Sequence, residues 1–358
     1  MHVHFAIMGL CALAVALDVR PRLGAGLFGV LFAYAHLCDV TNYLNHYYLI
    51  IQVSFLLAVL PATPTVPAWA LHAARAQVGL VYVFGGLAKL GPDWLLHGEP
   101  LTTWLAAATD VPIVGPLFAL PHAGLVASWA GAFFDLTIVG WLLWPRTRAV
   151  AYGVVVVFHL ITGRLFHLGL FPWLMTALAT IFFAPSWPRR LGFPRRPAAA
   201  IDLPRTRVLL AALVAVHLGI QAVVPWRGAL YGGNPLWHEQ GFRFAWNVML
   251  IEKSGALDFR VRDADTGRTF LVPASDYYTR VQAAMMATQP DLILQGAHAV
   301  ADDFRARGVR AEVYADAFVS LNGRARSRLI DPGVDLARER DTLAGKPWIL
   351  PAPNSPPP

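Results

Sequence analysis

Charged residues are scarce in this chain, and cysteine is nearly absent. Only 14% of the 358 residues are charged and 56% are hydrophobic, whereas about 25% of a typical globular protein is charged. This balance excludes a disordered chain and an ordinary soluble enzyme. The two cysteines, Cys11 and Cys38, both lie in apolar stretches, so a disulfide framework and a cysteine-based zinc site are excluded.

The short motifs of common soluble enzymes are also missing. We find no GxGxxG after a strand, no Walker loop, no HExxH and no Gly-x-Ser-x-Gly elbow, so nucleotide binding and acyl-serine chemistry have no support. The histidines form no metal-ligand spacing, and we expect no metal site. The net charge of +7 does not indicate nucleic acid as a partner, because the excess basic residues lie in short loops of the apolar part.

The charge is unevenly distributed along the chain. Residues 1–225 contain 13 Lys/Arg and 7 Asp/Glu, whereas residues 226–358 contain 16 and 15. We therefore predict a polytopic α-helical membrane protein with a small C-terminal extracytoplasmic α+β domain. Apolar runs close to the length of a bilayer crossing predict about eight transmembrane helices. They lie near residues 3–17, 23–38, 47–61, 76–90, 124–144, 149–163, 167–184 and 207–225.

The positions of the basic residues predict the orientation of these helices, because cytoplasmic loops collect Lys and Arg. With eight crossings, eleven arginines fall on one side, and the other side of this region has only Lys89 and Arg164. The C-terminal third is then outside the cytoplasm. The eleven are Arg20, Arg22, Arg75, Arg146, Arg148, Arg189, Arg190, Arg195, Arg196, Arg205 and Arg207.

The C-terminal third changes to a pattern of short strands and helices. Two alternating runs flank residues 263–267 and predict a β-hairpin, and Asn322-Gly323 predicts a second hairpin. We expect three regions, namely a helical catalytic domain at 1–225, the α+β domain at 226–350 and a Pro-rich disordered tail at 351–358.

Two helices are expected between these hairpins. Ser275 is a candidate cap for a helix that begins at Asp276 and is interrupted by Pro290. A second helical run ends near Gly308.

Lys89 follows Gly85 and Gly86 at the end of the fourth predicted span. One interpretation is a lysine that reaches the lipid head groups from a span end. The other is a buried amine held neutral, because burial disfavours the ammonium form, and a neutral lysine is a usable general base. The two glycines allow close helix approach and favour burial. Asp93 and Trp94 follow at once and would orient this segment.

Further polar residues lie near or inside the apolar runs, where they are costly and are candidates for functional sites. The tyrosines around Asn45-His46 fit an interfacial aromatic belt, which accounts less well for the Asn-His pair itself. His159 lies inside an apolar run and has a structural alternative as a hydrogen-bonded core histidine. Asp135 is an intramembrane carboxylate, whose alternative role is to pair with a polar group on a neighbouring helix.

Several motifs, in order along nearly the whole chain, resemble the vitamin K-dependent gamma-glutamyl carboxylases and their bacterial relatives, the HTTM-domain proteins. The resemblance extends from about Asn42 to Ile349. The motifs in the apolar part are NHYYL (45–49), VYVFGGLAKLGPDW (81–94), FFDL (133–136), FHLITGRLFHLGLFPWLM (158–175) and FAPSWPRRL (183–191). Those further on are GFRFAWNVML (241–250), DADTGRTFLVP, VYADAFVSLNGR and RLIDPGVDL.

The resemblance implies a coupled reaction, catalysed by a carbon–carbon lyase. Vitamin K hydroquinone, as phylloquinol or menaquinol, loses a proton to the family's lysine, which matches Lys89. Its reaction with O2 gives a base strong enough to remove the γ-proton of a peptidyl glutamate. The carbanion adds CO2 and vitamin K epoxide is released. Asn45 and His46 match the residues that bind and polarise the quinone oxygens, and Phe242 and Trp246 match an aromatic pair that positions it.

His159 matches the family's helix histidine and is expected to hold an anionic intermediate or a substrate carboxylate. Arg164, close by in sequence, is a candidate clamp for that carboxylate or for CO2. A dry pocket in the membrane suits a lipid hydroquinone and a carbanion that must avoid water.

The chain also departs from the animal enzymes. It lacks their long C-terminal extension and the cysteines of the soluble part, and the first residue of the aromatic pair, Phe242, lacks the hydroxyl that a tyrosine has in some relatives. The length and the absence of disulfides favour a bacterial inner-membrane protein. Its expected partners are a glutamate-containing peptide or protein and membrane lipid. Two alternatives stay open, namely quinol epoxidation without glutamate carboxylation and a non-catalytic membrane protein that binds a lipid or a peptide.

Overall fold

The structure, a computed structural model, describes residues 1–60, 66–166, 168–192 and 204–357. Two arginines used in the charge argument, Arg195 and Arg196, and the last residue of the predicted tail, Pro358, lie outside the described residues. The chain divides into two compact units. The first contains Met1–Ala88 and Gly131–Pro225, and the second contains Lys89–Ala130 and Trp226–Pro358.

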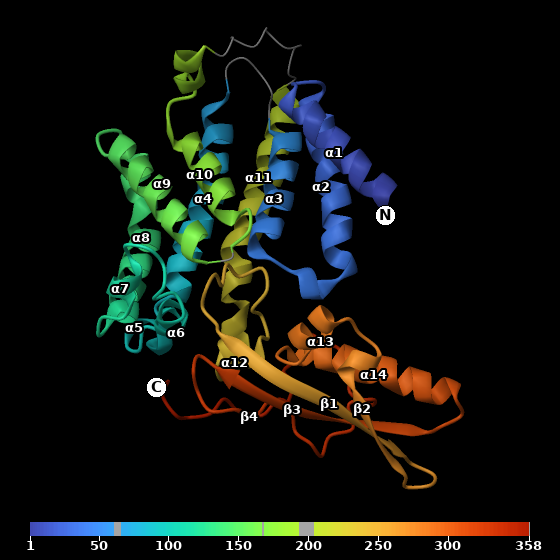
Figure 1. Ribbon diagram of the computed structural model, residues 1–358. Coiled ribbons are helices and arrows are strands. Elements are labelled where there is room, and N and C mark those ends of the chain that lie inside the picture. The colour runs from blue at the N-terminus through green and yellow to red at the C-terminus, as the bar shows by residue number, and fades with distance from the viewer. Residues whose placement is uncertain (61–65, 167, 193–203, 358) are drawn as a thin grey trace. The chain divides into compact units, whose positions relative to one another are not determined.

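Each of the eight predicted apolar runs coincides with a helix (Figure 1). These are α1 (His2–Ala16), α2 (Pro21–Cys38), α3 (Asn45–Val59), α4 (Ala68–Ala88), α8 (Ala123–Leu143), α9 (Arg148–Leu165), α10 (Phe171–Ala179) and α11 (Pro204–Val223). Among the described residues, three helical segments are long and apolar enough to cross a membrane by length and composition. They are Ala123–Leu143, Arg148–Leu165 and Val208–Leu230.

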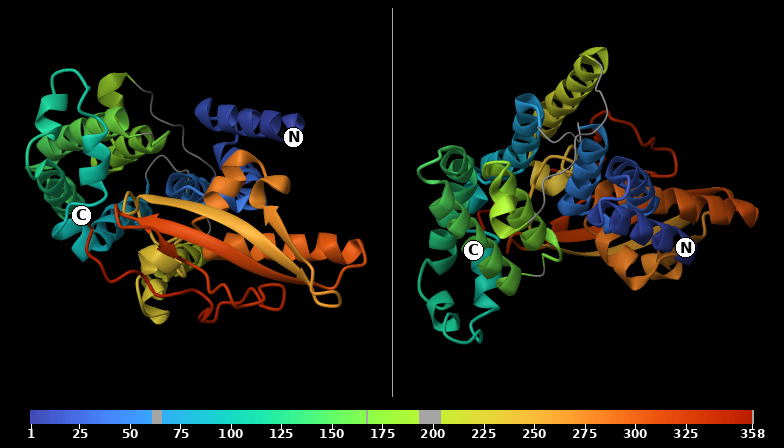
Figure 2. Two further views of the ribbon diagram at one scale, coloured as in Figure 1. Left: turned by 60° about the horizontal axis from the view of Figure 1, so that its bottom comes forward. Right: turned by 90° about the horizontal axis from the view of Figure 1, so that it is seen from above.

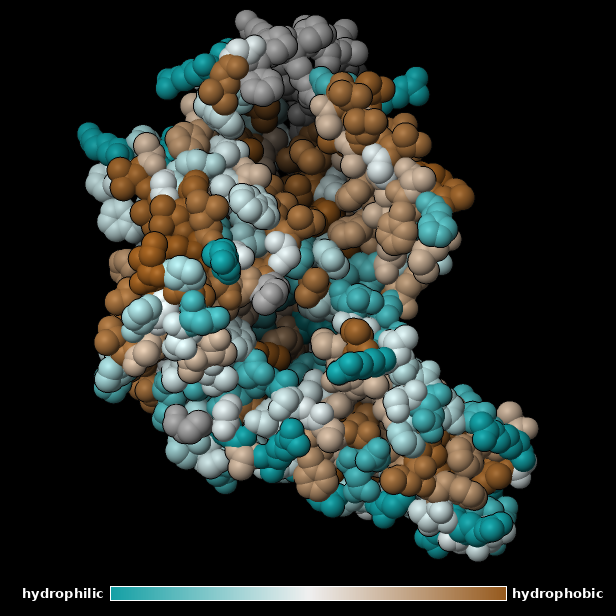
Figure 3. Space-filling view, in the orientation of Figure 1, coloured by the Kyte–Doolittle hydropathy of each residue, from teal (hydrophilic) through white to brown (hydrophobic). Residues whose placement is uncertain are grey.

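Large apolar side chains cover the outside of these helices, and Figure 3 shows them gathered on the helical face that it presents. Phe133 of α8, Val150 of α9 and Val208 of α11 are 65%, 73% and 71% exposed. Water would disfavour so much exposed apolar surface on helices, whereas acyl chains would not. The helical region is therefore that of an integral membrane protein.

A chain of buried polar side chains joins α3, α4 and α11. Tyr48 donates its hydroxyl proton to Gln221 at 2.9 Å, and Gln52 donates to the same Gln221 oxygen. Gln77 donates to Gln52 at 2.6 Å, and a ring nitrogen of His217 lies 2.8 Å from the Gln77 oxygen. Because amides in an apolar interior need partners, this network holds the three helices together.

Close approach at Gly86, expected from the Gly-Gly pair, is confirmed for α4 against α8. A Cβ atom at Gly86 would lie 2.8 Å from Leu136 Cγ and 3.0 Å from the Leu136 backbone nitrogen. Any side chain at position 86 would push the two helices apart.

Four antiparallel strands form the sheet of the second unit, in the order β2-β1-β3-β4. Both predicted hairpins are confirmed, β1 with β2 and β3 with β4. The strands are β1 (Lys253–Asp263), β2 (Thr269–Pro273), β3 (Ala311–Leu321) and β4 (Ser327–Arg328). The second hairpin turns at Asn322 and Gly323, which both have positive φ angles of 50° and 76°, as its tight turn requires.

Two helices, α13 (Arg280–Met286) and α14 (Pro290–Ala306), lie on the same face of the sheet (Figure 2). Ile293 and Ala297 of α14 are fully buried, as are Phe259 of β1 and Val313 of β3. Gly296 brings α14 close to the sheet, because a Cβ atom there would lie 2.8 Å from the Phe259 ring. The predicted α+β architecture of the C-terminal region is confirmed.

The predicted start of the first helix is wrong. Residues Ala274–Asp276 form a 3₁₀ turn, and α13 begins at Arg280. Thr279 rather than Ser275 is the cap, because its hydroxyl accepts from the Gln282 N–H while the Gln282 side chain accepts from the Thr279 N–H. This reciprocal pair satisfies two backbone donors, which Ser275 does not do. Pro290 begins α14, and the predicted end near Gly308 agrees with the observed end at Ala306.

The second unit also contains the segment that follows Lys89. Its short helices are α5 (Pro92–Leu95), α6 (Leu101–Ala106) and α7 (Gly115–Phe118), and α12 (Pro235–His238) precedes β1. At the other end of the unit, the backbone carbonyl of Ser355 accepts a hydrogen bond from Arg324 at 2.8 Å.

Candidate functional site

Lys89 is the residue immediately after α4, and its side chain is enclosed by the second unit. The residue is only 5% exposed. Its Nζ lies 3.4 Å from the backbone oxygen of Val248, to which it donates, and 5.1 Å from the centre of the Trp94 ring. A carbonyl and an aromatic face thus hold the amine inside the protein.

Trp94 and Asp93 fix the segment that follows. Trp94 is 4% exposed and donates its indole N–H to the carbonyl of Ser128 at 2.6 Å. Asp93 accepts two hydrogen bonds from the guanidinium of Arg324, at 2.6 and 2.7 Å, and one from the Asn322 amide at 2.9 Å. The side chains of Asp93 and Arg324 are 13% and 9% exposed. Both predicted orienting residues are therefore held by several contacts.

Two carboxyl groups in this segment have shifted pKa values of opposite sign. Burial opposes the charge of Asp93, but the hydrogen bonds from Arg324 and Asn322 outweigh it and lower the pKa of Asp93. Burial raises the pKa of Glu99, against the hydrogen bonds it accepts from Thr103. Glu99 is 2% exposed. Asp93 is thus a stable anion, and Glu99 is the more easily protonated of the two.

Asn45 and His46 begin α3 in the first unit. The Tyr43 hydroxyl donates to the Asn45 side-chain oxygen at 3.0 Å. His46 is 7% exposed, and its ring centre lies 4.7 Å from that of Tyr47 and 6.1 Å from that of Phe171. The pair is therefore set in an aromatic environment at the start of a helix.

His36 joins this group, although the sequence reasoning did not select it. It is 6% exposed, and its ring centre lies 5.3 Å from Tyr43 and 5.7 Å from Tyr47. Among the described residues neither of its ring nitrogens has a hydrogen-bond partner. The signal was present, because a histidine inside an apolar span is itself a candidate for a functional site.

His159 lies in the middle of α9 and is 3% exposed. Its Nε2 is 3.0 Å from the hydroxyl of Tyr82, another residue that the sequence reasoning did not single out. The buried Nδ1 has no partner within the part of the chain that the structure describes. The Phe171 ring centre lies 6.1 Å from the His159 ring and the same distance from the His46 ring. Phe171 therefore contacts both predicted histidines.

His159 and Arg164 line one pocket of about 260 Å³ between α9 and α10. Arg164, in the last turn of α9, is exposed. Gly163 and Gly169 leave room in the wall, and a Cβ atom at Gly169 would come within 3.6 Å of the His46 ring. The apolar rim includes Trp173, which is 64% exposed. An imidazole and a guanidinium thus face a space large enough for a small anion.

The remaining predicted residues lie elsewhere. Trp246 is fully buried in the second unit, and Phe242 borders a pocket of about 200 Å³ in the same unit. Asp135 is 9% exposed on α8. Next to it, Phe134 stacks on Phe158 with 3.8 Å between ring centres.

The ten predicted residues fall into two groups, one in each unit. The first unit contains Asn45, His46, Asp135, His159 and Arg164, and the second contains Lys89, Asp93, Trp94, Phe242 and Trp246.

The comparison with known protein families supplies the assignment. Residues 1–187 match the HTTM domain, and residues 206–355 match the lumenal domain of vitamin K-dependent gamma-carboxylase. The chain belongs to the vitamin K-dependent gamma-carboxylase family. No solved structure matches the chain. Membership of this family indicates a carboxylase-like enzyme whose family depends on vitamin K, and the apolar helices indicate an integral membrane protein.

Proposed function

We propose that this protein carboxylates the γ-carbon of peptidyl glutamate and couples that step to the oxygenation of a vitamin K-type hydroquinone to its epoxide. In this proposal Lys89 is the base that takes a phenolic proton at Nζ. The observation that carries it is the burial of Lys89, with its amine against a backbone carbonyl and an indole ring. Such a lysine is shielded from bulk water and held at a fixed place in the protein.

The first group of residues fits an aromatic head group that carries two hydroxyls. The unpartnered nitrogens of His36 offer hydrogen bonds beside the rings of Tyr43 and Tyr47. Asn45, which accepts from the Tyr43 hydroxyl, and His46, beside the Tyr47 ring, would bind and polarise the oxygens. For Phe242 and Trp246, the role of an aromatic pair that positions the quinone is proposed from the resemblance of residues 241–250 to the family motif. When bound, the hydroquinone and O2 supply the strong base that removes the γ-proton.

The pocket beside α9 fits a carboxylate or CO2. The guanidinium of Arg164 can pair with a carboxylate through two parallel hydrogen bonds. The free Nδ1 of His159 can donate a further one when Tyr82 donates to Nε2, because neutral imidazole carries its proton on one nitrogen only. We assign this pocket to the glutamate side chain or to the CO2 that it captures.

We further propose that all eight apolar helices cross the membrane and that the α+β domain is extracytoplasmic, at a bacterial inner membrane. The support is the distribution of arginines along the sequence. A glutamate-containing peptide would then reach the protein from the side of the α+β domain, and the quinol from the lipid.

The decisive experiment supplies the purified full-length protein in lipid nanodiscs with reduced vitamin K, O2, ¹⁴C-bicarbonate and a short glutamate peptide. We expect epoxide and peptide-bound label in equal amounts. Epoxide without label would assign the protein to quinol epoxidation alone. Neither product, from folded protein that retains quinone, would show a non-catalytic binding protein. Parallel reactions with phylloquinol and menaquinol identify the preferred quinone.

A further inference from the structure

Lysine is used in only three positions of this chain, although Lys and Arg together number 29. All three lysines belong to the second unit, and all are buried. Lys89 is 5% exposed, and the side chains of Lys253 and Lys346 are 4% and 9% exposed. Exposed cations are arginines, for example Arg305 at 70%. An amine, unlike a guanidinium, offers three donors from one point.

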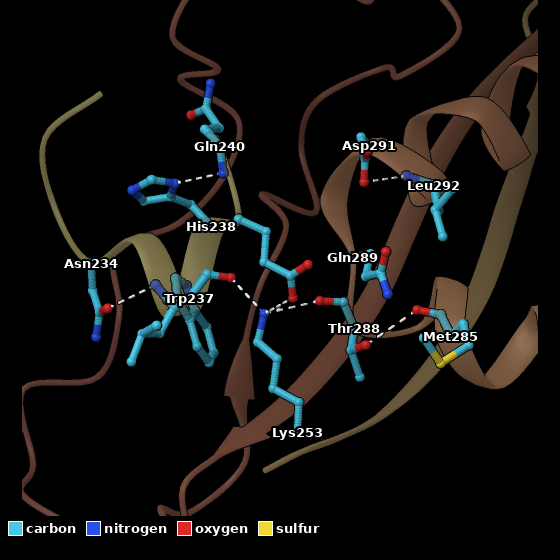
Figure 4. Close-up of polar contacts among 12 residues, drawn as sticks. Asn234, Trp237, His238, Gln240, Lys253, Met285, Thr288, Gln289, Asp291 and Leu292 are labelled. Atoms are coloured by element: carbon cyan, nitrogen blue, oxygen red, sulfur yellow. Dashed lines mark hydrogen bonds and ion pairs between the residues drawn. The ribbon is translucent and has the colours of Figure 1, made fainter. Parts of the chain in front are cut away.

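Lys253, the first residue of β1, uses all three donors (Figure 4). It donates to the Glu239 carboxylate at 2.6 Å, to the Trp237 carbonyl at 2.8 Å and to the Thr288 carbonyl at 3.1 Å. Burial lowers the pKa of Lys253, and the charge of Glu239 acts against that shift. The ion pair therefore ties three segments to one nitrogen, namely the end of α12, the start of β1 and the turn before α14.

The loop that begins at Glu239 and ends at Leu250 has an unusual backbone. Glu239, Phe244, Trp246 and Met249 are not glycine, yet their φ angles are 53°, 60°, 57° and 60°. Each such conformation costs about 1 kcal/mol or more and persists only where the surroundings enforce it.

Several contacts hold the loop, and three of them anchor its start, its middle and its end. Besides the Glu239–Lys253 pair, Arg243 in the middle of the loop donates to Asp291 and Gln289. At the far end, the Asn322 amide donates to the Leu250 carbonyl at 3.3 Å.

The loop presents one backbone group to the candidate base. The carbonyl of Val248 accepts the hydrogen bond from Lys89 Nζ, and Val248 lies between two of the residues with positive φ. An amine that donates one N–H to a fixed carbonyl has only two tetrahedral directions left for its lone pair, so the position of the loop restricts the directions from which Lys89 can accept a proton.

We propose that the Lys253–Glu239 pair is a positioning device for the base, because it holds the loop of residues 239–250 so that Val248 orients the Lys89 amine. The inference rests on the proposed role of Lys89. Lys253 and Glu239 act through the loop and do not touch substrate.

The test uses the full-length protein in nanodiscs with Lys253→Met, which keeps an unbranched side chain one atom shorter than lysine and removes its donors. One readout is the rate at which acetic anhydride modifies Lys89, measured by mass spectrometry in the variant and in the wild type under the same conditions. If Val248 no longer holds the amine, the rate of Lys89 modification should rise about fivefold over the wild type. This is the factor expected for the loss of about one hydrogen bond. The second readout is quinol epoxidation, for which we expect kcat to fall about tenfold with KM for the quinol unchanged.

Val313→Ala is the matched control, because Val313 is fully buried in β3 and pairs with Val261, eight positions along β1 from Lys253. It should lower stability and leave both readouts as in the wild type. Glu239→Gln is a milder second variant and should shift both readouts in the same direction as Lys253→Met. If Lys253→Met does not fold, the two readouts of Glu239→Gln test the proposal instead.

Unchanged Lys89 modification in the loop variants would overturn the proposal, as would an equal increase in Val313→Ala. The labelling readout needs no catalysis, so it separates the two questions. If the wild type forms no epoxide, the proposed function fails. A selective rise in Lys89 labelling in Lys253→Met would still establish that the Lys253–Glu239 pair positions the Lys89 amine.

Discussion

Asp93 and Arg324 are 231 positions apart in the sequence, and they form a two-pronged ion pair with oxygen–nitrogen distances of 2.6 and 2.7 Å. Asn322, in the same tight turn as Arg324, adds a third hydrogen bond to Asp93. The turn that joins β3 and β4 thus binds the segment that contains Lys89 and Trp94 through the side chain of Asp93.

Asp93→Asn should destabilise the protein by ~3 kcal/mol, because it leaves a largely buried guanidinium without its partner. The effect should depend on pH. The pKa of Asp93 is held below its ordinary value of 3.8, so the unfolded chain binds the proton more readily. The pair therefore stabilises the fold above pH 3.8, and this contribution is lost as the pH falls through the lower, folded-state pKa. Thermal unfolding in detergent between pH 3 and pH 7 measures it.

The matched control is Asp302→Asn, whose partner Arg305 is exposed. Exposed pairs contribute little, so this substitution should lower the free energy of unfolding by less than ~0.5 kcal/mol. Equal effects of the two substitutions, or a pH dependence that survives in Asp93→Asn, would show that the pair is not a determinant of stability.

Lys89→Ala should abolish epoxide formation, by ~10²-fold or more, as expected for the loss of a general base. Quinol turnover followed by chromatography measures it, with expression level and melting temperature as checks on folding. Lys346→Ala is the natural comparison, because it removes another buried lysine, which pairs with Asp341 at 2.9 Å. Full activity of Lys89→Ala would disprove the assignment of the base.

Arg164→Gln should raise KM for the glutamate peptide about tenfold, which corresponds to ~1.5 kcal/mol for a lost charge-assisted hydrogen bond. KM for the quinol should not change. Steady-state kinetics with each substrate varied in turn measure both constants. A rise in the KM for the quinol alone would show that Arg164 binds the quinol and not the peptide.

Tyr82→Phe should lower kcat about fivefold, because it removes the hydroxyl that holds Nε2 of His159 and costs ~1 kcal/mol. The ring and its packing against Phe134 stay in place. Single-turnover carboxylation measures the effect. Unchanged rates would limit this hydrogen bond to a structural role.

Gly86→Ala should destabilise the helical unit by ~1–3 kcal/mol, since the added methyl group would overlap Leu136. Gly140→Ala on α8 is the control, as a Cβ atom there meets nothing within 4 Å. Thermal unfolding in nanodiscs should separate the two. Equal melting temperatures would mean that the α4–α8 contact relaxes without cost.

The helices and hairpins could be predicted because their signals are local. Apolar length marks α8 and α9, and an Asn-Gly pair readily adopts the positive φ angles that a tight turn requires. The cap of α13 was misplaced because Ser275 and Thr279 are both acceptable caps by type. Only the reciprocal contact with Gln282 distinguishes them.

The contacts of the candidate site could not be predicted, because they join distant segments. Nothing near Lys89 in the sequence indicates that Val248 will accept its hydrogen bond. Tyr82 reads as one aromatic residue among many until it is seen beside His159. His36 is a different case, because its position inside an apolar run was sufficient to select it.

The membership of residues Lys89–Ala130 in the second unit has a practical consequence for producing that unit alone. A fragment that begins at Trp226 would leave Arg324 without the carboxylate of Asp93, and Glu252 without the indole N–H of Trp104. Both side chains would lose hydrogen bonds that the whole unit provides. Co-expression of the two pieces, or a single polypeptide that joins 89–130 to 226–358 through a flexible linker, would restore those partners.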